Sequence, residues 1–342
     1  MKKIAVVTNS LSGGGAERSM NLLCNELYNR DWDISLIPIN SSKPDLIQVM
    51  CPVYEINRVW NGSFLNTVLS FFRFNFLMFK LKPKVLVLNC DLPEFFGALL
   101  LFPIKLVVVE HVNFPWHTRL RLGRIIRFLL NLRGACWVSV SSHLSIWPRA
   151  LKPTAVLLNS ISSSVLDPTK KSGRVPLNRL IFIGRLTEQK RPDWIIKLGR
   201  TTGTEVGIYG EGSQEQMLRK LAQANPEKVS FFGFNPHVWT NVGQGDLLLV
   251  TSGWEGDGLV VLEALNNRVP ILLSDIPELR RFNLPDRNYC KNLGIFEEQI
   301  QEFKEDLNNL VIEDNIRKVI LDERMPGNIA ANWESFLEDN NI

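Results

Sequence analysis

The feature of this chain that most restricts its fold is the recurrence of short apolar runs, each followed by a segment with helical spacing. Near-continuous apolar runs of this length, separated by helices, are typical of buried parallel strands in α/β sheets. The runs are Ile4 to Thr8, Ile34 to Ile39, Val85 to Leu88, Leu106 to Val109, Ala135 to Val140, Ala155 to Leu158, Leu180 to Ile183, Val206 to Tyr209, Val229 to Phe232, Leu247 to Val250 and Ile271 to Leu273.

The composition changes in residues 162–178, where Ser, Pro, Gly and Lys replace apolar residues. Such a stretch is typical of a linker, and the alternation of strands and helices restarts beyond it. A chain of 342 residues is also long enough for two domains. We therefore predict an α/β fold with two Rossmann-like domains facing across a cleft, in residues 1–161 and 179–325. Residues 326–342 are expected to form a terminal helix near the seam between them.

Charge is distributed unevenly along the chain. Residues 1–165 contain 18 Lys and Arg against 9 Asp and Glu, a net charge of +9, whereas the remainder carries −5. The helix expected over Arg119 to Arg133 alternates arginines with Leu and Ile, and the segment Phe64 to Leu81 is rich in aromatic residues. A basic amphipathic helix can lie on an anionic membrane surface or can be an ordinary packed helix with a solvated basic face. We expect an anionic membrane surface as a partner, and no nucleic acid.

We expect no export signal or membrane-spanning segment in this sequence. The apolar part of its start, Ile4 to Thr8, is shorter than the core of a signal peptide. The longest apolar region, Phe95 to Val109, is too short to span a bilayer and is broken by Pro103 and Lys105. Five scattered cysteines without a C-x-x-C motif fit a reducing compartment and argue against a zinc site. These features predict a cytoplasmic protein without a metal site.

The stretch Asp246 to Asp275 predicts a strand, a Gly-rich turn from Gly253 to Gly258, a helix with its spacing over Leu259 to Leu265, and a second strand. A helix that begins near Asp257 would offer unpaired amides and the positive end of its dipole to a phosphate. Glu255 precedes the turn, and Glu263 lies eight residues later, where it could accept hydrogen bonds from a vicinal diol such as ribose. The two carboxylates can also simply be favourable charges near a helix start.

Further polar and glycine residues follow the strands at the expected carboxyl edges. Arg185 and Lys190 follow the first strand of the second domain, where cations suit a diphosphate. Gly210 follows the next strand and could let a base ring approach.

In the first domain, Gly14 and Gly15 end a Gly-rich loop, which can bring backbone close to a ligand or act as a flexible connector. His111 follows the strand Leu106 to Val109 and could meet a substrate or be structural. Asp31-Trp32-Asp33 matches a metal-binding Asp-x-Asp pattern, but it lies at the opposite edge of the sheet, and we interpret it as a solvated turn.

The order of these motifs resembles the retaining, nucleotide-sugar-dependent glycosyltransferases of family 4, which have the GT-B fold. The motifs are the Gly-Gly-Gly-Ala-Glu-Arg loop, Gly184-Arg185-Leu186 with Lys190, Gly210-x-Gly212, and Glu255-Gly-Asp-Gly258 with Glu263. The resemblance spans nearly the whole chain. It departs at Asp257, where the family commonly has an aromatic residue, and at Ser160, where Asn-Gly-Ile is usual.

The resemblance implies a role for each matching residue. Arg185 and Lys190 would hold the donor diphosphate, and Glu263 would bind the ribose hydroxyls. Glu255 would contact the transferred sugar as a catalytic residue. The backbone amides of Asp257, Gly258 and Leu259 would contact the donor phosphates and sugar. Gly14 and Gly15 would approach the phosphates from the first domain. His111 would act as a second catalytic residue and contact the donor sugar.

The activity implied is transfer of a hexose from a nucleotide sugar, UDP-linked, to a glycan or lipid-linked glycan acceptor in bacterial surface polysaccharide assembly. No metal cofactor is expected, and the protein would associate peripherally with the inner face of the cell membrane. The first domain would face the acceptor and the second would bind the nucleotide sugar. The alternatives are a nucleotide-sugar epimerase of the same fold and a non-catalytic nucleotide- or glycan-binding module. A dehydrogenase is disfavoured because neither Gly-rich turn completes G-x-G-x-x-G.

Overall fold

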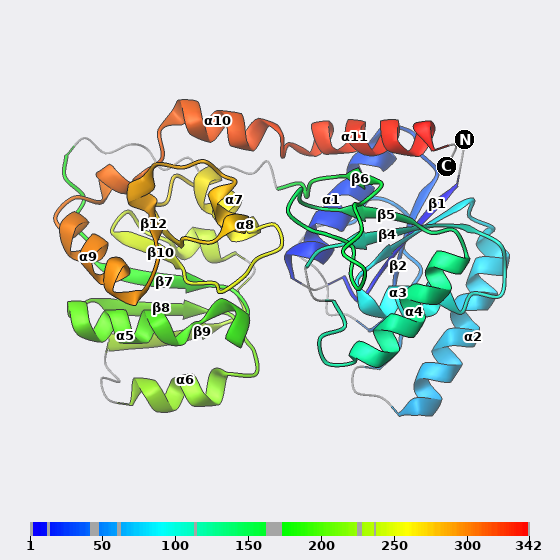
Figure 1. The fold of residues 1–342 in the computed structure, drawn as a ribbon, viewed down its shortest axis with the longest axis horizontal. Helices are drawn as coiled ribbons and strands as arrows, with labels where there is room; N and C mark the ends of the chain where they lie inside the picture. The colour runs from blue at the N-terminus through cyan, green and yellow to red at the C-terminus, as the bar shows by residue number, and fades with distance from the viewer. Residues whose placement is uncertain are drawn as a thin grey trace. The chain divides into compact units, whose positions relative to one another are not determined.

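The computed structural model describes residues 3–11, 14–41, 48–59, 63–112, 115–161, 173–223, 228–235 and 237–340. The chain forms two compact units, residues 1–162 with 324–342 and residues 163–323. Each unit contains a six-stranded parallel sheet with helices around it (Figure 1). The prediction of two successive parallel α/β sheets is therefore confirmed.

The first sheet has the strand order β2-β1-β3-β4-β5-β6. Alternate residues of its central strand enter different cores, since Ile4 and Val6 pack on one face and Ala5 and Val7 on the other. A sheet buried on both faces explains why its strands read as continuous apolar runs. Its strands are β1 (Ile4–Thr8), β2 (Ile34–Pro38), β3 (Val85–Asn89), β4 (Lys105–Glu110), β5 (Cys136–Ser139) and β6 (Ala155–Val156).

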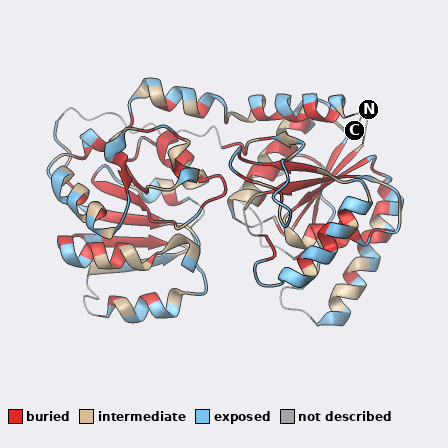
Figure 2. Ribbon diagram, in the orientation of Figure 1, coloured by how far each residue is buried: buried red, intermediate tan, exposed pale blue. Residues whose placement is uncertain are grey.

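Helices cover both faces of this sheet, so the strands are buried between them (Figure 2). The core on one face contains residues of α1 (Gly15–Asn29) and α11 (Pro326–Asp339). The core on the other face contains residues of α2 (Phe64–Leu81), α3 (Asp91–Ala98) and α4 (Leu120–Leu132). The helices α2, α3 and α4 therefore form one layer.

The terminal helix α11 packs on the first unit rather than on the preceding part of the second. Trp333 is fully buried in the core that α11 shares with α1. Glu334 accepts hydrogen bonds from Arg30 Nη1 at 2.8 Å and from Trp32 Nε1 at 2.7 Å, which fixes the helix against the turn before β2. The Asp31-Trp32-Asp33 turn thus serves to anchor α11.

The second sheet has the order β12-β11-β10-β7-β8-β9. Five of its strands lie in the predicted runs, whereas β12 is only two residues long and its pattern is too short to recognise. Its strands are β7 (Arg179–Ile183), β8 (Glu205–Tyr209), β9 (Val229–Gly233), β10 (Asp246–Val250), β11 (Ile271–Ser274) and β12 (Tyr289–Cys290). The helices of the unit are α5 (Asp193–Thr202), α6 (Glu215–Ala222), α7 (Leu259–Asn266), α8 (Pro277–Arg280), α9 (Leu293–Phe303) and α10 (Asp314–Asp322).

The predicted linker lies partly outside the described residues, which resume at residue 173. Its last part is bound to the second unit. Val175 N donates to Asp306 Oδ1 at 3.2 Å, and Leu177 N donates to the carbonyl of Lys304 at 2.8 Å. These bonds bring the chain to the start of β7.

Each sheet has a point where the strand order reverses. In the first sheet β1 pairs with both β2 and β3, and in the second β7 pairs with both β8 and β10. Loops that leave the carboxyl ends of neighbouring strands at such a point diverge to opposite faces and leave room for a ligand. The loops after β7 and β10 are therefore expected to form a ligand site of the second unit.

Candidate active site

The loops after β7 and β10 meet through an ion pair. Lys190 Nζ lies 2.5 Å from Glu255 Oε1, and Ser252 Oγ donates to the same oxygen at 2.6 Å. Glu255 is only 4% exposed, so its charge depends on these partners. Two residues that are 65 positions apart in the sequence thus converge at the switch point of the sheet.

Hydrogen bonds to backbone carbonyls also hold these two loops together. Lys190 ends a 3₁₀ helix, η1 (Glu188–Lys190), and Thr251 Oγ1 donates to the carbonyl of Lys190 at 2.8 Å. Gly253 N donates to the carbonyl of Gln189 at 2.8 Å. A Cβ on Gly253 would lie 2.9 Å from Arg191 Nη2, so glycine permits this close approach. The position of Lys190 is therefore set by the loop backbone as well as by its own side chain.

Arg185 follows Gly184 at the end of β7 and is exposed. Its carbonyl accepts a hydrogen bond from Thr187 N at 2.9 Å, whereas no ion pair or side-chain hydrogen bond of its guanidinium is found among the described residues. The loop after β7 therefore carries a positive charge in addition to that of Lys190, as an anion-binding loop requires.

Gly210 has a structural reason to be glycine. Its φ is +140°, and a Cβ there would lie 1.9 Å from the carbonyl oxygen of Gly184. Gly210 N donates to the carbonyl of Gly233 at 2.7 Å, which ties the end of β8 to β9. Gly210 therefore lets the loops after β7 and β8 pass in contact.

The turn before α7 is held from outside by an arginine. Gly258 adopts a left-handed conformation with φ +57° and caps α7, so the helix begins at Leu259, directly after the predicted turn. The carboxylate of Asp257 pairs with Arg281, whose Nη2 also donates to the carbonyl of Asp257 at 2.5 Å. Asp257 thus fixes the turn whose amides precede the helix. Sequence reasoning missed Arg281 because it lies 24 residues away in a different loop.

Glu263 lies in α7 and is partly buried. Trp239 Nε1, from the 3₁₀ helix η3 (Val238–Asn241), donates to Glu263 Oε2 at 3.1 Å. An indole N–H donated to one oxygen orients the carboxylate. Trp239 is a second residue that the sequence did not reveal.

The first unit places its predicted residues at the carboxyl edge of its own sheet. Gly14 is exposed and caps α1, which begins at Gly15, while residues 12 and 13 of the loop lie outside the described ranges. His111 follows β4, and its Nε2 lies 2.5 Å from Asn89 Oδ1 at the end of β3. Asn89 therefore orients the imidazole.

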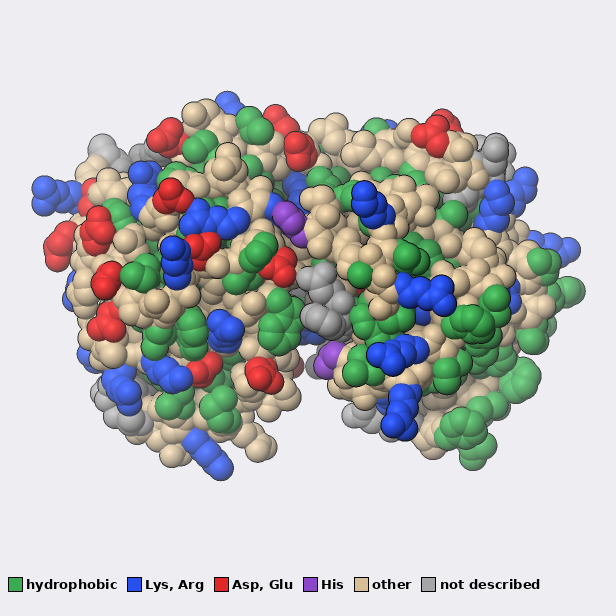
Figure 3. Space-filling model, viewed as in Figure 1, with side chains coloured by type: hydrophobic (Ala, Val, Ile, Leu, Met, Phe, Trp, Pro, Cys, Tyr) green, Lys and Arg blue, Asp and Glu red, His purple; other side chains and the backbone are tan. Residues whose placement is uncertain are grey.

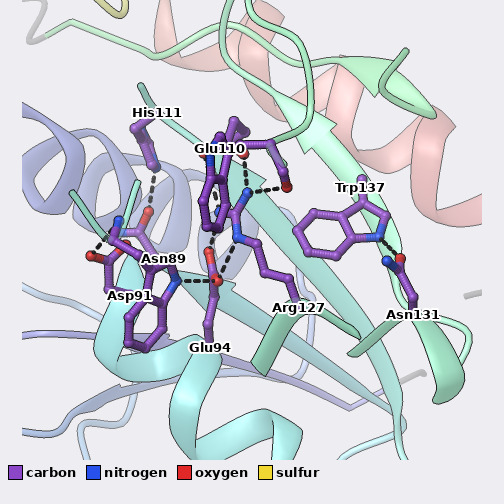
Figure 4. A network of polar contacts seen from close by, with 10 residues as sticks. Asn89, Asp91, Glu94, Glu110, His111, Arg127, Asn131 and Trp137 are labelled. Atoms are coloured by element: carbon purple, nitrogen blue, oxygen red, sulfur yellow. Dashed lines mark hydrogen bonds and ion pairs between the residues drawn. The ribbon is translucent and has the colours of Figure 1, made fainter. Parts of the chain in front are cut away.

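A buried charge network lies behind His111 (Figure 4). Arg127 of α4 lies between Glu94 and Glu110, with its Nη2 at 2.5 Å from Glu94 Oε1 and its Nη1 paired with Glu110. Trp116 Nε1 also donates to Glu94, at 2.8 Å. Burial raises the pKa of Glu110 to about 7, against the lowering effect of Arg127. Burial lowers the pKa of Arg127, but both carboxylates raise it, so the guanidinium stays charged.

The loops after β7 and β10 of the second unit thus carry cations, a carboxylate and the start of a helix, groups suited to a diphosphate and its attached group. Within the described ranges, no three His, Cys, Asp or Glu side chains gather in a way that could hold a metal ion. None of the described helices is long and apolar enough to cross a bilayer.

Comparison with known proteins identifies the family of the chain and several relatives. Residues 169–339, half of the 342-residue chain, match the family described as Glycosyl transferases group 1. The chain is 30% identical over 112 residues to the GtfA subunit of a UDP-N-acetylglucosamine–peptide N-acetylglucosaminyltransferase of Streptococcus pneumoniae, over 31% of this chain and 22% of the relative. It is 28% identical over 118 residues to WbnH, an O-antigen biosynthesis glycosyltransferase of Escherichia coli, over 34% of each protein. The chain therefore spans about a third or less of these relatives.

A solved structure extends the likeness to the whole fold. The structure of Anabaena HepE in complex with UDP and glucose has a TM-score of 0.80 and 16% identity, over 99% of this chain and 100% of HepE. At this identity the likeness concerns the fold, which is the GT-B class with its two Rossmann-like domains.

Proposed function

The chain belongs to the glycosyl transferases group 1 family, and from that premise we propose that it is a retaining hexosyltransferase. It moves a hexose from a nucleoside diphosphate sugar to a hydroxyl of a glycan acceptor. The observation that carries this proposal is the contact of Lys190 with Glu255 at the switch point of the second sheet, beside the exposed Arg185. Positive groups at this point suit the pyrophosphate of such a donor.

The donor would lie along the loops of the second unit in a defined order. Arg185 and Lys190 hold the diphosphate, together with the amides of Asp257, Gly258 and Leu259 before and at the start of α7. Glu263, oriented by Trp239, accepts the ribose hydroxyls. Gly210 lies at the loop where the base approaches, and Glu255 contacts the transferred sugar.

The family pattern also assigns roles to residues of the first unit. In that pattern Gly14 and Gly15 would present backbone to the donor phosphates, and His111, held by Asn89, would contact the donor sugar. These roles rest on the family pattern and on the position of each residue at the carboxyl edge of its sheet.

Charge explains how these groups would accelerate transfer. The bond from the anomeric carbon to the diphosphate breaks, and negative charge grows on the leaving phosphates. Arg185, Lys190 and the N-terminus of α7 stabilise this charge more strongly in the transition state than in the ground state. The acceptor oxygen attacks the same face of the sugar, and a donor phosphate oxygen takes its proton. We propose that these two cations neutralise the charge of the departing diphosphate, in place of a divalent metal.

A UDP-linked donor is the proposal that the relatives favour. The name of the pneumococcal relative contains UDP-N-acetylglucosamine, and the HepE structure contains UDP and glucose. The O-antigen role of WbnH favours a surface glycan as product.

We propose that this acceptor is lipid-linked and that the enzyme acts at the inner face of the cell membrane. On the outer surface of α4 the exposed residues Arg119, Arg121 and Arg124 form a basic edge with no carboxylate on the helix. Anionic lipid headgroups attract such an edge, and salt weakens the attraction. Sedimentation with anionic vesicles at low salt measures this association.

The central test is replacement of Lys190. We expect Lys190→Ala to lower kcat/KM for donor transfer at least about tenfold to a hundredfold, because it removes a cation that stabilises the departing diphosphate. Lys197→Ala is the matched control, since Lys197 lies partly exposed on α5 of the same unit and pairs with Asp193 at 2.7 Å. EDTA should leave turnover of the wild type unchanged.

Product analysis separates this proposal from its alternatives. NMR of the donor incubated with enzyme alone would show isomerised sugar nucleotide for an epimerase. Equal turnover of the Lys190 and Lys197 variants would contradict the assignment of the site.

A further inference from the structure

The helix α2 exposes a stripe of large apolar side chains. Each is between 58% and 82% exposed, although α2 is a regular helix whose other face is buried in the core. Exposed apolar residues are normal when scattered, whereas a continuous row on one helix indicates a binding surface. The row consists of Phe64, Leu65, Leu69, Phe72, Phe76 and Phe79, and we name it the α2 stripe.

The spacing explains why these residues share one side. Steps of four, three, four and three residues separate Leu65, Leu69, Phe72, Phe76 and Phe79, so they lie within a narrow sector of the helix. Arg73 and Lys80 flank this sector and are also exposed.

The outer side of α4 has the same character. Ile125, Phe128 and Leu132 are more than half exposed, and Arg121 and Arg124 lie among them. Both helices contribute to the same core on one face of the sheet, with α3 between them. In the space-filling view, hydrophobic side chains gather over this part of the first unit with Lys and Arg among them (Figure 3).

Carboxylates are absent from these two segments of the sequence. Residues 56–90 contain no Asp or Glu, and neither do residues 111–161. On α3 between them, Glu94 is buried in the network with Arg127. The surface is therefore apolar with a cationic border.

We propose that the α2 stripe inserts into the headgroup–acyl boundary of an anionic lipid bilayer, with the cations of α2 and α4 on the headgroups. This inference rests on the proposed membrane association and goes further, because it names the element that inserts and adds an apolar contribution to electrostatic attraction. A second copy of the chain is the less suitable occupant, since cations along the border would face one another.

The start of α2 lies close to the carboxyl edge of the first sheet. Asn40 follows β2, and Arg58 donates to its Oδ1 at 2.7 Å and to Thr67 Oγ1 of α2 at 3.2 Å. The first turns of α2 are therefore held at the carboxyl edge of the sheet, the edge that carries Gly14 and His111. An enzyme resting on the α2 stripe would meet a lipid-linked acceptor at this edge.

The test compares full-length variants in sedimentation with vesicles of phosphatidylglycerol and phosphatidylcholine, at low and high salt. Because salt screens charges but not apolar insertion, the wild type should keep part of its binding at high salt. Phe72→Ser/Phe76→Ser should lose that part and partition at least about tenfold less. Met217→Ser/Val319→Ser, at exposed positions of α6 and α10, is the control and should bind like the wild type.

Three results would overturn the inference. One is equal binding of the α2 variant and the wild type. Another is wild-type binding that high salt abolishes completely, because such binding would be electrostatic only, without insertion of the α2 stripe. A third is a wild-type dimer in light scattering that the α2 variant disrupts, without vesicle binding. Donor turnover with a water-soluble acceptor, measured on the same variants, reports on the proposed function independently.

Discussion

At the residue scale, the contact of Lys190 with Glu255 joins opposite charges of the loops after β7 and β10, the proposed donor site. Glu255 is buried and also accepts a bond from Ser252, so the carboxylate is fixed before any ligand arrives. A fixed charge needs little reorganisation when negative charge develops nearby. We therefore regard Ser252, which the sequence did not single out, as part of the arrangement that positions Lys190.

Trp239 provides a prediction at the same scale. Trp239→Phe keeps an aromatic ring but removes the N–H that Glu263 accepts, so we expect KM for the donor to rise about threefold to tenfold with kcat nearly unchanged. Steady-state kinetics measures this split. Trp32→Phe removes a bond of the same kind, to Glu334 in the first unit, and should leave KM for the donor as it is. An equal rise of KM in both variants would contradict the assignment.

At the scale of elements, α4 combines a buried and an exposed function. Arg127 points into the sheet and pairs with Glu94 of α3 and Glu110 of β4, so it joins three elements behind His111. Three residues earlier, Arg124 lies in solvent on the same helix. Arg127 therefore forms buried ion pairs whereas Arg124 is solvated, and the spacing of the arginines in the sequence does not distinguish these two roles.

Replacement of Arg127 tests this division. Arg127→Met should lower the free energy of unfolding by about 3–5 kcal/mol, because two carboxylates lose their buried partner. Arg124→Met should change it by less than about 0.5 kcal/mol. Urea denaturation of both variants makes the comparison, and adding Glu94→Gln to the Arg127 variant should restore part of the loss. A similar effect of the two arginine variants would refute the buried role.

At the scale of the whole molecule, each unit completes its own core. The chain leaves the first unit, builds the second, and returns through α11 to cover α1. The first unit therefore depends on residues from both ends of the sequence. Removal of α11 would expose Trp333's partners in the core, so the terminal helix is part of the unit and not an appendage.

Stability should depend on pH through Asp91, at the start of α3. Burial, and then the neighbouring Glu94, raise the pKa of Asp91 to about 6. A carboxyl group with a raised folded-state pKa contributes stability that is fully present below about pH 4 and is lost as pH rises through about 6. We expect wild type to lose about 2 kcal/mol more than Asp91→Asn between pH 4 and pH 7, after allowance for partial exposure. Urea denaturation at both pH values measures the difference, and identical pH profiles would exclude it.

The sequence by itself determined the strands other than β12, the helices α4, α7 and α11, and the identity of the charged loops, because apolar runs and turn residues act locally. The start of α7 at Leu259 followed from the Gly-rich turn that ends at Gly258, whereas the aromatic-rich segment Phe64 to Leu81 was not assigned as a helix before the structure showed α2. Only the tertiary structure decided the partners of the candidate residues. Arg281, Trp239 and Asn89 reach Asp257, Glu263 and His111 from other loops and strands. Such pairings depend on how strands are ordered in a sheet, and no spacing along the chain encodes them.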